Sequence, residues 1–289
     1  MNKDLNYFLR VFKKNSLIQI MKKIHYFYFF PKNIVFLKKL KTGLIMALPS
    51  KDKGLSKDIF VNGIREEKAL TFFLNMLGSD DTIIDCGANM GFYVMHEAKK
   101  SKFVHAVEPV ETSLCFTGVN CFLNNIENFK LYNLAIGEKN SQITFFKSKY
   151  FNLSSVEKRI DKNIDLGYSE IKIDMQTIDF FMEKNNISAN VLRMDTEGME
   201  VNILKGATKF LKQKNACVFL EVHKVFIGSK GVKDLCDLLL NNGFVEAYFC
   251  DDEKIYDDAY FQKVGLLRLK ETADLQKEVF HIFCKKDGC

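Results

Sequence analysis

The stretch TIIDCGANMG, residues 82–91, constrains the fold of this chain more than any other. Its first three residues are β-branched, which is typical of a strand buried in a parallel sheet. Gly87 and Gly91 follow, and glycine lets the backbone turn tightly and approach a ligand closely. From Phe92 onward the apolar residues recur at helical spacing. The stretch therefore predicts a strand, a glycine-bearing turn and a helix, which form the first half of a nucleotide-binding βαβ unit.

The turn differs from the dinucleotide fingerprint at its first position. G-x-G-x-x-G requires glycine there, whereas this chain has Asp85. A carboxylate at that position would repel a pyrophosphate, because two like charges would meet with little water between them. It suits a ligand that carries an ammonium or a sulfonium group. The residue disfavours an NAD-dependent oxidoreductase, and the D-x-G-x-N-x-G spacing resembles the first motif of methyltransferases that use S-adenosylmethionine.

Strands and helices are expected to alternate through the rest of the chain. The hydrophobic pattern predicts helices over 65–77, 91–100, 111–124, 198–213 and 231–242. It predicts core strands over 82–86, 103–107, 130–136, 190–195, 216–222, 244–250 and 279–285, and two further strands over 142–148 and 171–177. Residues 42–63 are expected to form loops between short strands. The order predicts an α/β, Rossmann-like fold with a mostly parallel seven-stranded sheet, helices on both faces and an antiparallel edge.

Positive charge is concentrated at the start of the chain. Residues 1–57 contain 13 lysines and arginines against two acids, whereas the remainder contains 29 against 34. We therefore divide the chain into a basic, aromatic-rich N-terminal extension (1–57) and a Rossmann-like domain (58–289). Residues 1–48 allow two interpretations: a basic amphipathic helix on an anionic membrane surface or acidic partner, or an extension that packs its aromatic residues on the main domain. No recognition motif accompanies the charge, so no nucleic acid partner is expected.

The cellular compartment is predicted from the cysteines and the apolar runs. The eight cysteines show neither a C-x-x-C pair nor a zinc-binding spacing, which favours a reducing compartment. No uncharged apolar run approaches the ~18 residues of a spanning helix, and no secretory signal pattern is found. The expected location is the cytoplasm, with peripheral contact of residues 1–48 at the inner membrane face as the further expectation.

Acidic side chains follow several of the predicted strands. Ligands of open α/β sheets bind beyond the carboxyl ends of the strands. Glu108-Pro109 ends the second strand, about twenty residues beyond the first turn, where a carboxylate holds ribose hydroxyls. Asp195 and Glu197 follow the strand at 190–195, and Glu221 and His223 share one face of the next strand end. A carboxylate beside a histidine is a candidate general base.

Taken together, these motifs resemble those of FkbM-type methyltransferases. The matching pieces are DCGANMGFY, EP at 108–109, NCFLN at 120–124, NLAIG at 133–137, TID at 177–179, RMDTEGME at 193–200 and EVH at 221–223. The match covers roughly residues 60 to 225. Arg193 stands where the family usually has lysine, a change that keeps the charge.

The resemblance implies a class I methyltransferase fold and S-adenosylmethionine as the cofactor. The turn of Asp85, Gly87, Ala88, Asn89 and Gly91 would hold the methionine portion, Glu108 with Pro109 the ribose, and Ala135 with Ile136 the adenine. Asp195, Glu197, Glu221 and His223 would face the acceptor, with Glu197 or His223 as base and Asp195 orienting. No compact ligand spacing demands a metal, and none is predicted.

The expected reaction is O-methylation of a hydroxyl on a sugar, glycan or other small metabolite. The alternative is a non-catalytic module that binds S-adenosylmethionine or serves as a scaffold in surface glycan assembly. The acids beyond the fourth and fifth strands disfavour this alternative. The acceptor itself and the oligomeric state are left open by the sequence.

Overall fold

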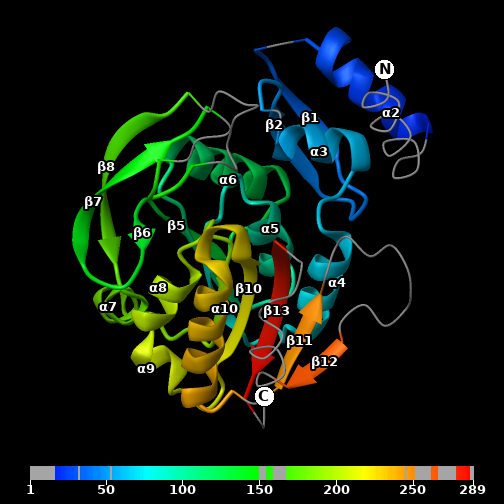
Figure 1. The fold of residues 1–289 in the computed structure, drawn as a ribbon. Helices are drawn as coiled ribbons and strands as arrows, with labels where there is room; N and C mark the ends of the chain where they lie inside the picture. Colours follow the sequence, from blue (N-terminus) through cyan, green and yellow to red (C-terminus); the bar gives the residue numbers. More distant parts are fainter. Residues whose placement is uncertain are drawn as a thin grey trace, which may run out of the picture.

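The computed structural model describes residues 17–31, 33–52, 54–149, 154–158, 167–244, 246–250, 262–265 and 278–286. Within these residues the centre of the molecule is an eight-stranded sheet (Figure 1) with the strand order β12-β11-β13-β10-β9-β3-β4-β5. Its strands are β3 (Thr82–Cys86), β4 (Phe103–Val107), β5 (Phe129–Tyr132), β9 (Val191–Met194), β10 (Cys217–His223), β11 (Glu246–Cys250), β12 (Gln262–Gly265) and β13 (Val279–Lys285).

The strand directions confirm the predicted mostly parallel sheet. Strands β10, β9, β3, β4 and β5 pair in parallel, whereas β13 is antiparallel to both β10 and β11. The eighth strand, β12, pairs antiparallel with β11 at the edge and is not among the seven predicted strands. Its four residues, QKVG, contain a single strongly apolar side chain, so they show no alternation that could reveal a strand.

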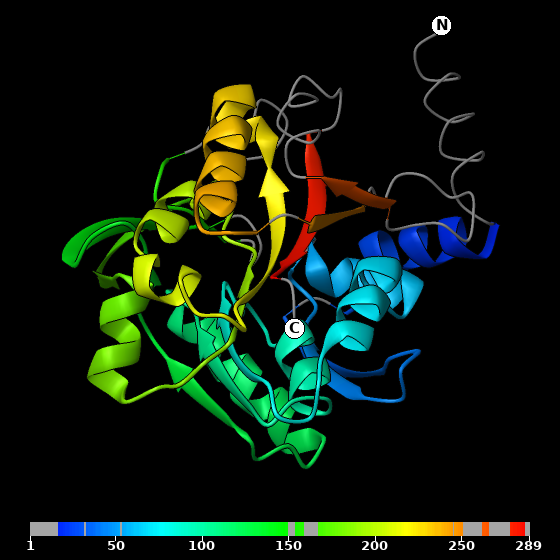
Figure 2. The ribbon, with the colours of Figure 1, turned by 90° about the horizontal axis from the view of Figure 1, so that it is seen from below.

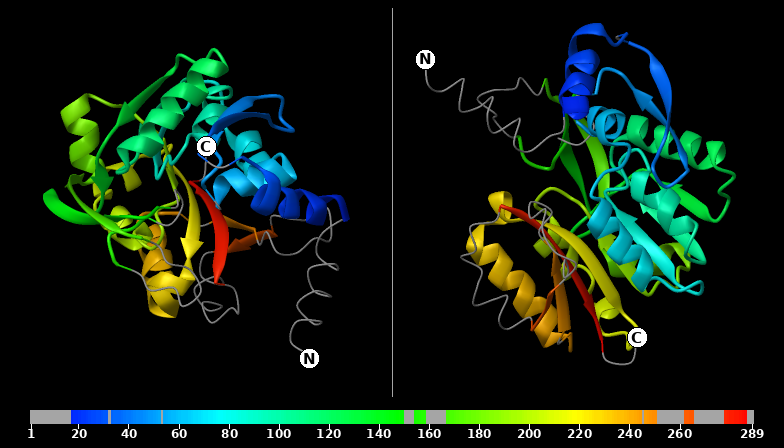
Figure 3. Two further views of the ribbon diagram at one scale, coloured as in Figure 1. Left: turned by 90° about the horizontal axis from the view of Figure 1, so that it is seen from above. Right: turned by 90° about the vertical axis from the view of Figure 1, so that its right-hand side faces the viewer.

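Helices cover both faces of the sheet, as predicted. Neighbouring strand residues point to opposite faces: Ile83 and Phe219 pack into one core, Ile84 and Leu220 into the other. The first core is closed by α3 (Leu55–Asn62), α4 (Glu67–Met76), α5 (Phe92–Ala98) and α6 (Glu111–Leu123). The second is closed by α7 (Ile178–Asn185), α8 (Glu200–Lys205), α9 (Thr208–Leu211) and α10 (Lys224–Asn241). The right-hand view of Figure 3 shows α10 and α5 on opposite faces.

The predicted strand at 130–136 is in fact two strands in two sheets. β5 ends at Tyr132, and β6 (Ala135–Ile136) joins a separate three-stranded sheet with β8 (Ser169–Gln176) and β7 (Ser141–Lys147). Between them, Asn133 donates its side-chain amide to the carbonyls of Glu108 and Pro109. These two hydrogen bonds hold the segment between β5 and β6 against the end of β4. The small sheet therefore stands beside the carboxyl ends of the central strands.

Two predicted helices have different bounds in the structure. The helix expected at 198–213 is divided into α8 and α9 around Gly206, where a Cβ atom would lie 2.3 Å from the carbonyl oxygen of Gly137. This close approach of two backbones accounts for the glycine. The helix expected at 231–242 begins earlier, at Lys224, and is kinked at Gly228, whose φ is 65°.

The segment expected to be loops between short strands, 42–63, contains the strand β2 (Ile45–Pro49) and also a helix that was not predicted. β1 (Val35–Lys39) and β2 form a hairpin, and α3 follows. Two asparagines on α6 extend the hydrogen bonding of β2: Asn120 Oδ1 accepts from the Ala47 amide at 2.7 Å, and Asn124 Oδ1 accepts from the Ile45 amide at 2.8 Å. The asparagines are one helical turn apart and their partners are two strand residues apart, so the two spacings match. The predicted domain division after residue 57 falls inside α3.

The first described helix lies at the periphery of the molecule (Figures 1 and 2). α2 (Leu17–Ile24) contacts α3 and continues into η1 (His25–Phe29). Tyr26 is buried, and its ring packs against those of Phe30 and Phe60. The extension therefore does pack part of its aromatic surface on the main domain, while residues 1–16 lie outside the described residues. No helix among the described residues has the length and apolar character needed to cross a bilayer.

Candidate active site

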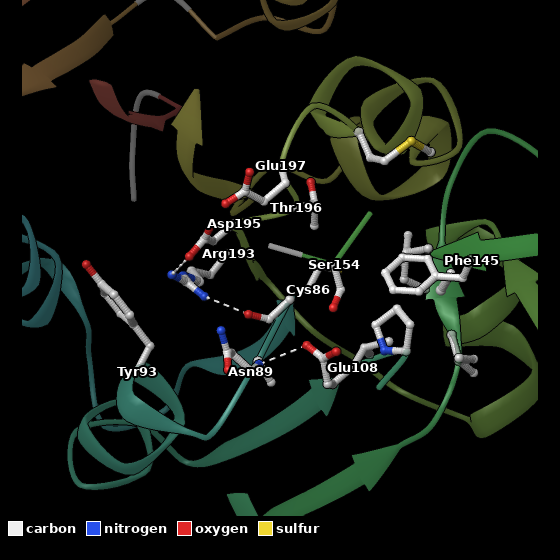
Figure 4. A pocket seen from close by; sticks show the side chains of 18 of the residues that line it. Cys86, Asn89, Tyr93, Glu108, Phe145, Ser154, Arg193, Asp195, Thr196 and Glu197 are labelled. Carbon is white, nitrogen blue, oxygen red and sulfur yellow. Dashed lines mark hydrogen bonds and ion pairs between the residues drawn. The ribbon is translucent and has the colours of Figure 1, made fainter. Parts of the chain in front are cut away.

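A cleft with about 950 Å³ of empty space opens at the carboxyl ends of β3, β4 and β9 (Figure 4). The order of the strands reverses here, because the chain runs outward from β3 to β5 and then returns to β9 on the other side of β3. Ligands of such sheets bind at this switch point. Nine of the predicted residues line the cleft: Gly87, Ala88, Asn89, Glu108, Pro109, Ala135, Ile136, Asp195 and Glu197.

The turn after β3 brings its backbone against the end of β9. Gly87 has φ of 85°, and a Cβ atom at this position would lie 1.9 Å from the carbonyl oxygen of Asp195. No side chain fits there, so glycine is required for the two strand ends to meet. Gly91, with φ of 80°, packs against Thr117 on α6, where a Cβ atom would lie 2.7 Å from Thr117 Cγ2. Gly91 therefore shapes the turn from behind and is not part of the cleft lining.

Glu108 is held rigidly at the end of β4. Its Oε1 accepts from the Val110 amide at 2.8 Å, and its Oε2 accepts from the Asn89 amide at 3.0 Å. Burial raises the pKa of Glu108 to about 7, although both amide hydrogen bonds favour the ionised form. The carboxylate thus joins the glycine turn to the second strand and is oriented before any ligand binds.

Arg193 occupies the centre of the site. The sequence analysis had noted only that it keeps the positive charge of the lysine usual at this position. Its Nη1 donates to Asp85 Oδ1 at 2.9 Å, and its Nη2 donates to Asp195 Oδ2 at 3.2 Å. The guanidinium carbon also lies 4.0 Å from the centre of the Tyr93 ring. Asp85 is fully buried and does not line the cleft. The structure therefore places the Asp85 carboxylate in an internal ion pair that fixes the relative positions of β3 and β9.

The same arginine influences the titration of Asp195. Burial would raise the pKa of the Asp195 carboxyl, but Arg193 and His223 favour its ionised form and bring the pKa below its usual value. Asp195 therefore presents a negative charge to the cleft. Figure 4 shows Asp195 and Glu197 together on one side of the cleft, with Glu108 on another.

His223 lies among four carboxylates at the end of β10. Its Nδ1 is 2.9 Å from Glu200 Oε1, and its Nε2 lies 3.8 Å from Glu197 Oε1 and 3.9 Å from both Asp195 Oδ1 and Glu221 Oε1. Burial lowers the pKa of His223, but the hydrogen bond to Glu200 and the nearby carboxylates outweigh burial and raise the pKa to about 10. The surrounding carboxylates therefore favour the protonated form of the imidazole, in which His223 holds a proton more readily than it accepts one.

A second group of residues, which the sequence analysis did not predict, lies beside the cleft. Arg65 lines the cleft and is hydrogen-bonded to Glu66, which also accepts from the Tyr93 hydroxyl at 3.0 Å. His281, on β13, lies 3.5 Å from Glu66 through its Nε2. Arg65 and Glu66 precede α4 and His281 is near the end of the chain. No local pattern connects segments so far apart, so the sequence had no signal for this group.

The fold and the site define a Rossmann-like α/β domain with an acidic residue, Asp85, in place of the first glycine of the dinucleotide fingerprint. Residues 85–246 match the sequence model of the Methyltransferase FkbM domain, which is more than half of the chain. The protein therefore belongs to the FkbM methyltransferase family. A search of curated proteins finds no match.

Solved structures with a similar arrangement are remote in sequence. Methyltransferase FkbM from Methylobacillus flagellatus KT is 14% identical with a TM-score of 0.46, over 78% of this chain and 52% of that one. TYW2 from M. jannaschii, in complex with AdoMet, is 13% identical with a TM-score of 0.48, over 89% of this chain and 86% of that one. This chain thus spans about half the length of the Methylobacillus protein.

Proposed function

We propose that this protein uses S-adenosylmethionine to methylate a hydroxyl oxygen of a sugar, glycan or other small metabolite. The observation that carries the proposal is the carboxylate of Glu108. Each of its oxygens accepts one backbone N–H and keeps a second lone pair, so the group can accept from two neighbouring ribose hydroxyls.

Two further features of the cleft fit the cofactor. Asn89 Oδ1 is buried and has no hydrogen-bond partner among the described residues, so it is available to a donor on the ligand. Ala135, Ile136 and Phe145 form an apolar wall beside Glu108, where a flat adenine ring would be shielded from water.

When bound, S-adenosylmethionine supplies an electrophilic methyl carbon on a sulfonium sulfur. Glu108 and the turn around Asn89 orient that carbon toward the acids at the end of β9. Glu197 accepts the proton that the acceptor hydroxyl loses as the new carbon–oxygen bond forms and the carbon–sulfur bond breaks. Glu197 is preferred over His223 because Glu197 lines the cleft, whereas His223 is not among the lining residues. Its left-handed φ of 53° is a strained conformation that proteins retain mostly at functional sites.

Transfer of a labelled methyl group tests the choice of acceptor. We expect the protein to label hydroxylated small metabolites or glycans from methyl-labelled S-adenosylmethionine, and Glu197→Gln to lose at least 100-fold in turnover while still binding the cofactor. The control is Glu183→Gln, an exposed carboxyl on α7, which should keep full activity. Cofactor binding without turnover on any acceptor would favour the non-catalytic binding module instead.

We also propose a cytoplasmic protein whose α2 contacts an anionic membrane surface. The six cysteines whose state is described are free, as in a reducing compartment. Leu17, Ile18 and Met21 are 63%, 66% and 62% exposed, and Lys22 and Lys23 are on the same helix. Apolar side chains beside lysines are typical of helices that lie in the membrane interface.

Vesicle binding tests the membrane contact. Vesicles of phosphatidylcholine and phosphatidylserine should co-sediment with the protein, and replacing Leu17, Ile18 and Met21 by serine should abolish this binding. Phe122→Ser on α6, which removes an apolar side chain that is 80% exposed elsewhere on the surface, is the matched control and should bind as the wild type does. Equal binding by all three proteins would exclude α2 as the contact.

A further inference from the structure

The end of β10 gathers several buried carboxyl groups around one imidazole. Glu200 and Glu221 are 0% and 7% exposed. Among the described residues, His223 is the ion-pair partner of both, and neither has another. Asp195, by contrast, also pairs with Arg193 through its Oδ2, at 3.2 Å. Buried charge without compensation is costly, and proteins relieve it by pairing or by metal coordination.

The geometry around His223 Nε2 has the dimensions of a cation site. Three carboxylate oxygens, from Asp195, Glu197 and Glu221, lie 3.8 to 3.9 Å from this nitrogen. These separations are too long for hydrogen bonds. Ligand atoms at about 2.1 Å from one ion are roughly 3.0 to 4.2 Å apart, depending on the angle between them. The gap between the nitrogen and the oxygens therefore matches the space that one ion would bridge.

The opposite side of the imidazole is arranged as in metal-binding histidines. Nδ1 lies 2.9 Å from Glu200 Oε1, so this nitrogen carries the proton and Nε2 points into the gap. Histidines that bind metals almost always donate their second N–H to a carboxylate or carbonyl, which fixes the tautomer and the ring orientation. Glu200 is thus a positioning residue, because it would act through His223 without contacting the ion.

Glu221 provides an independent observation. Its carboxylate is nearly fully buried, and its Oε2 has no hydrogen-bond partner among the described residues. Its Oε1 points toward the same gap, 3.9 Å from His223 Nε2. A buried carboxyl oxygen without a hydrogen-bond partner needs an explanation, and a cation bound in the adjacent gap would provide one.

We propose that Asp195, Glu197 and His223 bind one divalent transition-metal ion at the acceptor side of the cleft, with Glu221 as a further oxygen ligand. The three principal residues offer ligand atoms that all lie within 4.8 Å of one another. Carboxylate oxygens with a single imidazole suit Mn²⁺ better than Mg²⁺ or Ca²⁺, which prefer oxygen alone. Asp195 and Glu197 line the cleft, so the ion would face the acceptor and could hold its oxygen atoms.

Two further observations agree with this choice of metal ligands. A second group, Glu66, Glu221 and His281, also has ligand spacing, but Glu66 is already bonded to Arg65 and Tyr93. Arg65 and Tyr93 occupy both oxygens of Glu66, whereas Asp195 gives only its Oδ2 to Arg193 and keeps Oδ1 for an ion. The proposed ligand role is also compatible with proton acceptance by Glu197, because a carboxylate that binds through one oxygen keeps the other as an acceptor.

Titration of the purified full-length chain with Mn²⁺, followed by electron paramagnetic resonance without S-adenosylmethionine, tests the site. The signal of free Mn²⁺ should be suppressed until one ion per chain is bound. Glu197→Gln and His223→Gln should each weaken binding at least 100-fold, and Glu200→Gln about 10- to 100-fold through the ring orientation. Glu183→Gln, on the surface of α7, should bind as the wild type does.

The outcomes separate this proposal from the methyltransferase proposal. Each variant is checked for folding by circular dichroism and for cofactor binding by calorimetry, which does not depend on the ion. A folded wild type that leaves the free Mn²⁺ signal unchanged would overturn the cation site, and so would equal binding by wild type, Glu197→Gln and His223→Gln. Neither result would affect the assignment of the cofactor cleft.

Discussion

At the scale of single residues, Arg193 connects the two halves of the site. It bonds both Asp85 and Asp195 while being 2% exposed. Removing one partner of a buried ion pair lowers stability by far more than the net contribution of the pair, because a buried charge remains without compensation. Family members with lysine at this position would have a single point charge where Arg193 has a planar fork that reaches two carboxylates.

We expect Arg193→Ala to lower the free energy of unfolding by about 3 to 5 kcal/mol, because it leaves the fully buried Asp85 without its cation. Urea denaturation followed by circular dichroism measures the change. Lys209→Ala removes the exposed pair with Glu183 and should have little effect. If the two variants lost equal stability, the central role of Arg193 would be contradicted.

Glu108 should make cofactor binding dependent on pH. Its pKa is raised to about 7, and only the ionised carboxylate can accept from both ribose hydroxyls. Affinity for S-adenosylmethionine should therefore fall as the pH drops from 8 to 6, where the group gains a proton. Calorimetric titrations across this range measure the effect. In Glu108→Gln, which cannot titrate, the dependence should be absent, and a dependence that persists in this variant would assign it to another group.

At the scale of elements, the turn between β3 and α5 depends on one close approach. Gly87 and Gly43 both have positive φ, of 85° and 90°, but only Gly87 has a neighbour in the path of a Cβ atom. The two glycines therefore separate backbone strain from steric overlap. Comparing alanine variants at the two positions therefore tests whether the cleft requires the close contact between Gly87 and the end of β9.

We expect Gly87→Ala to abolish S-adenosylmethionine binding, since the methyl group would push the turn away from the Asp195 carbonyl. Gly43→Ala, with nothing within 4 Å of the added carbon, should lose only the stability that its left-handed backbone costs, about 1 kcal/mol, and should keep full affinity. Calorimetry and thermal unfolding of both variants give the two quantities. Retained affinity in Gly87→Ala would show that the turn can move without harm.

The sequence predicted the bounds of those strands that are marked by a short apolar run of their own. β3, β4 and β13 have the predicted bounds because short apolar runs define each of them. The division of 130–136 between two sheets was missed, since the pattern of a strand does not show which sheet it joins. The helix α3 was missed because LSKDIFVN is followed by glycine and preceded by a polar segment that resembles a loop.

At the scale of the whole molecule, the fold brings together residues that the sequence separates widely. Asp195, Glu197, Glu221 and His223 were expected near one another because they follow neighbouring parallel strands. Their mutual distances, and the bond from His223 to Glu200, depend on how α8 and β10 pack. The proposed cation site has no signal in the sequence for the same reason, because no compact spacing marks Asp195, Glu197 and His223 as ligands and only the fold brings them together.

The central claim is that the cleft beyond β3 and β4 binds S-adenosylmethionine, and calorimetric titration of the purified protein tests it most directly. The wild type should bind the cofactor with a dissociation constant in the micromolar range, and Glu108→Ala should lose this binding while remaining folded, because the carboxylate that holds the ribose is gone. A well-folded wild type that does not bind S-adenosylmethionine would contradict the assignment of the cleft and the proposed reaction with it.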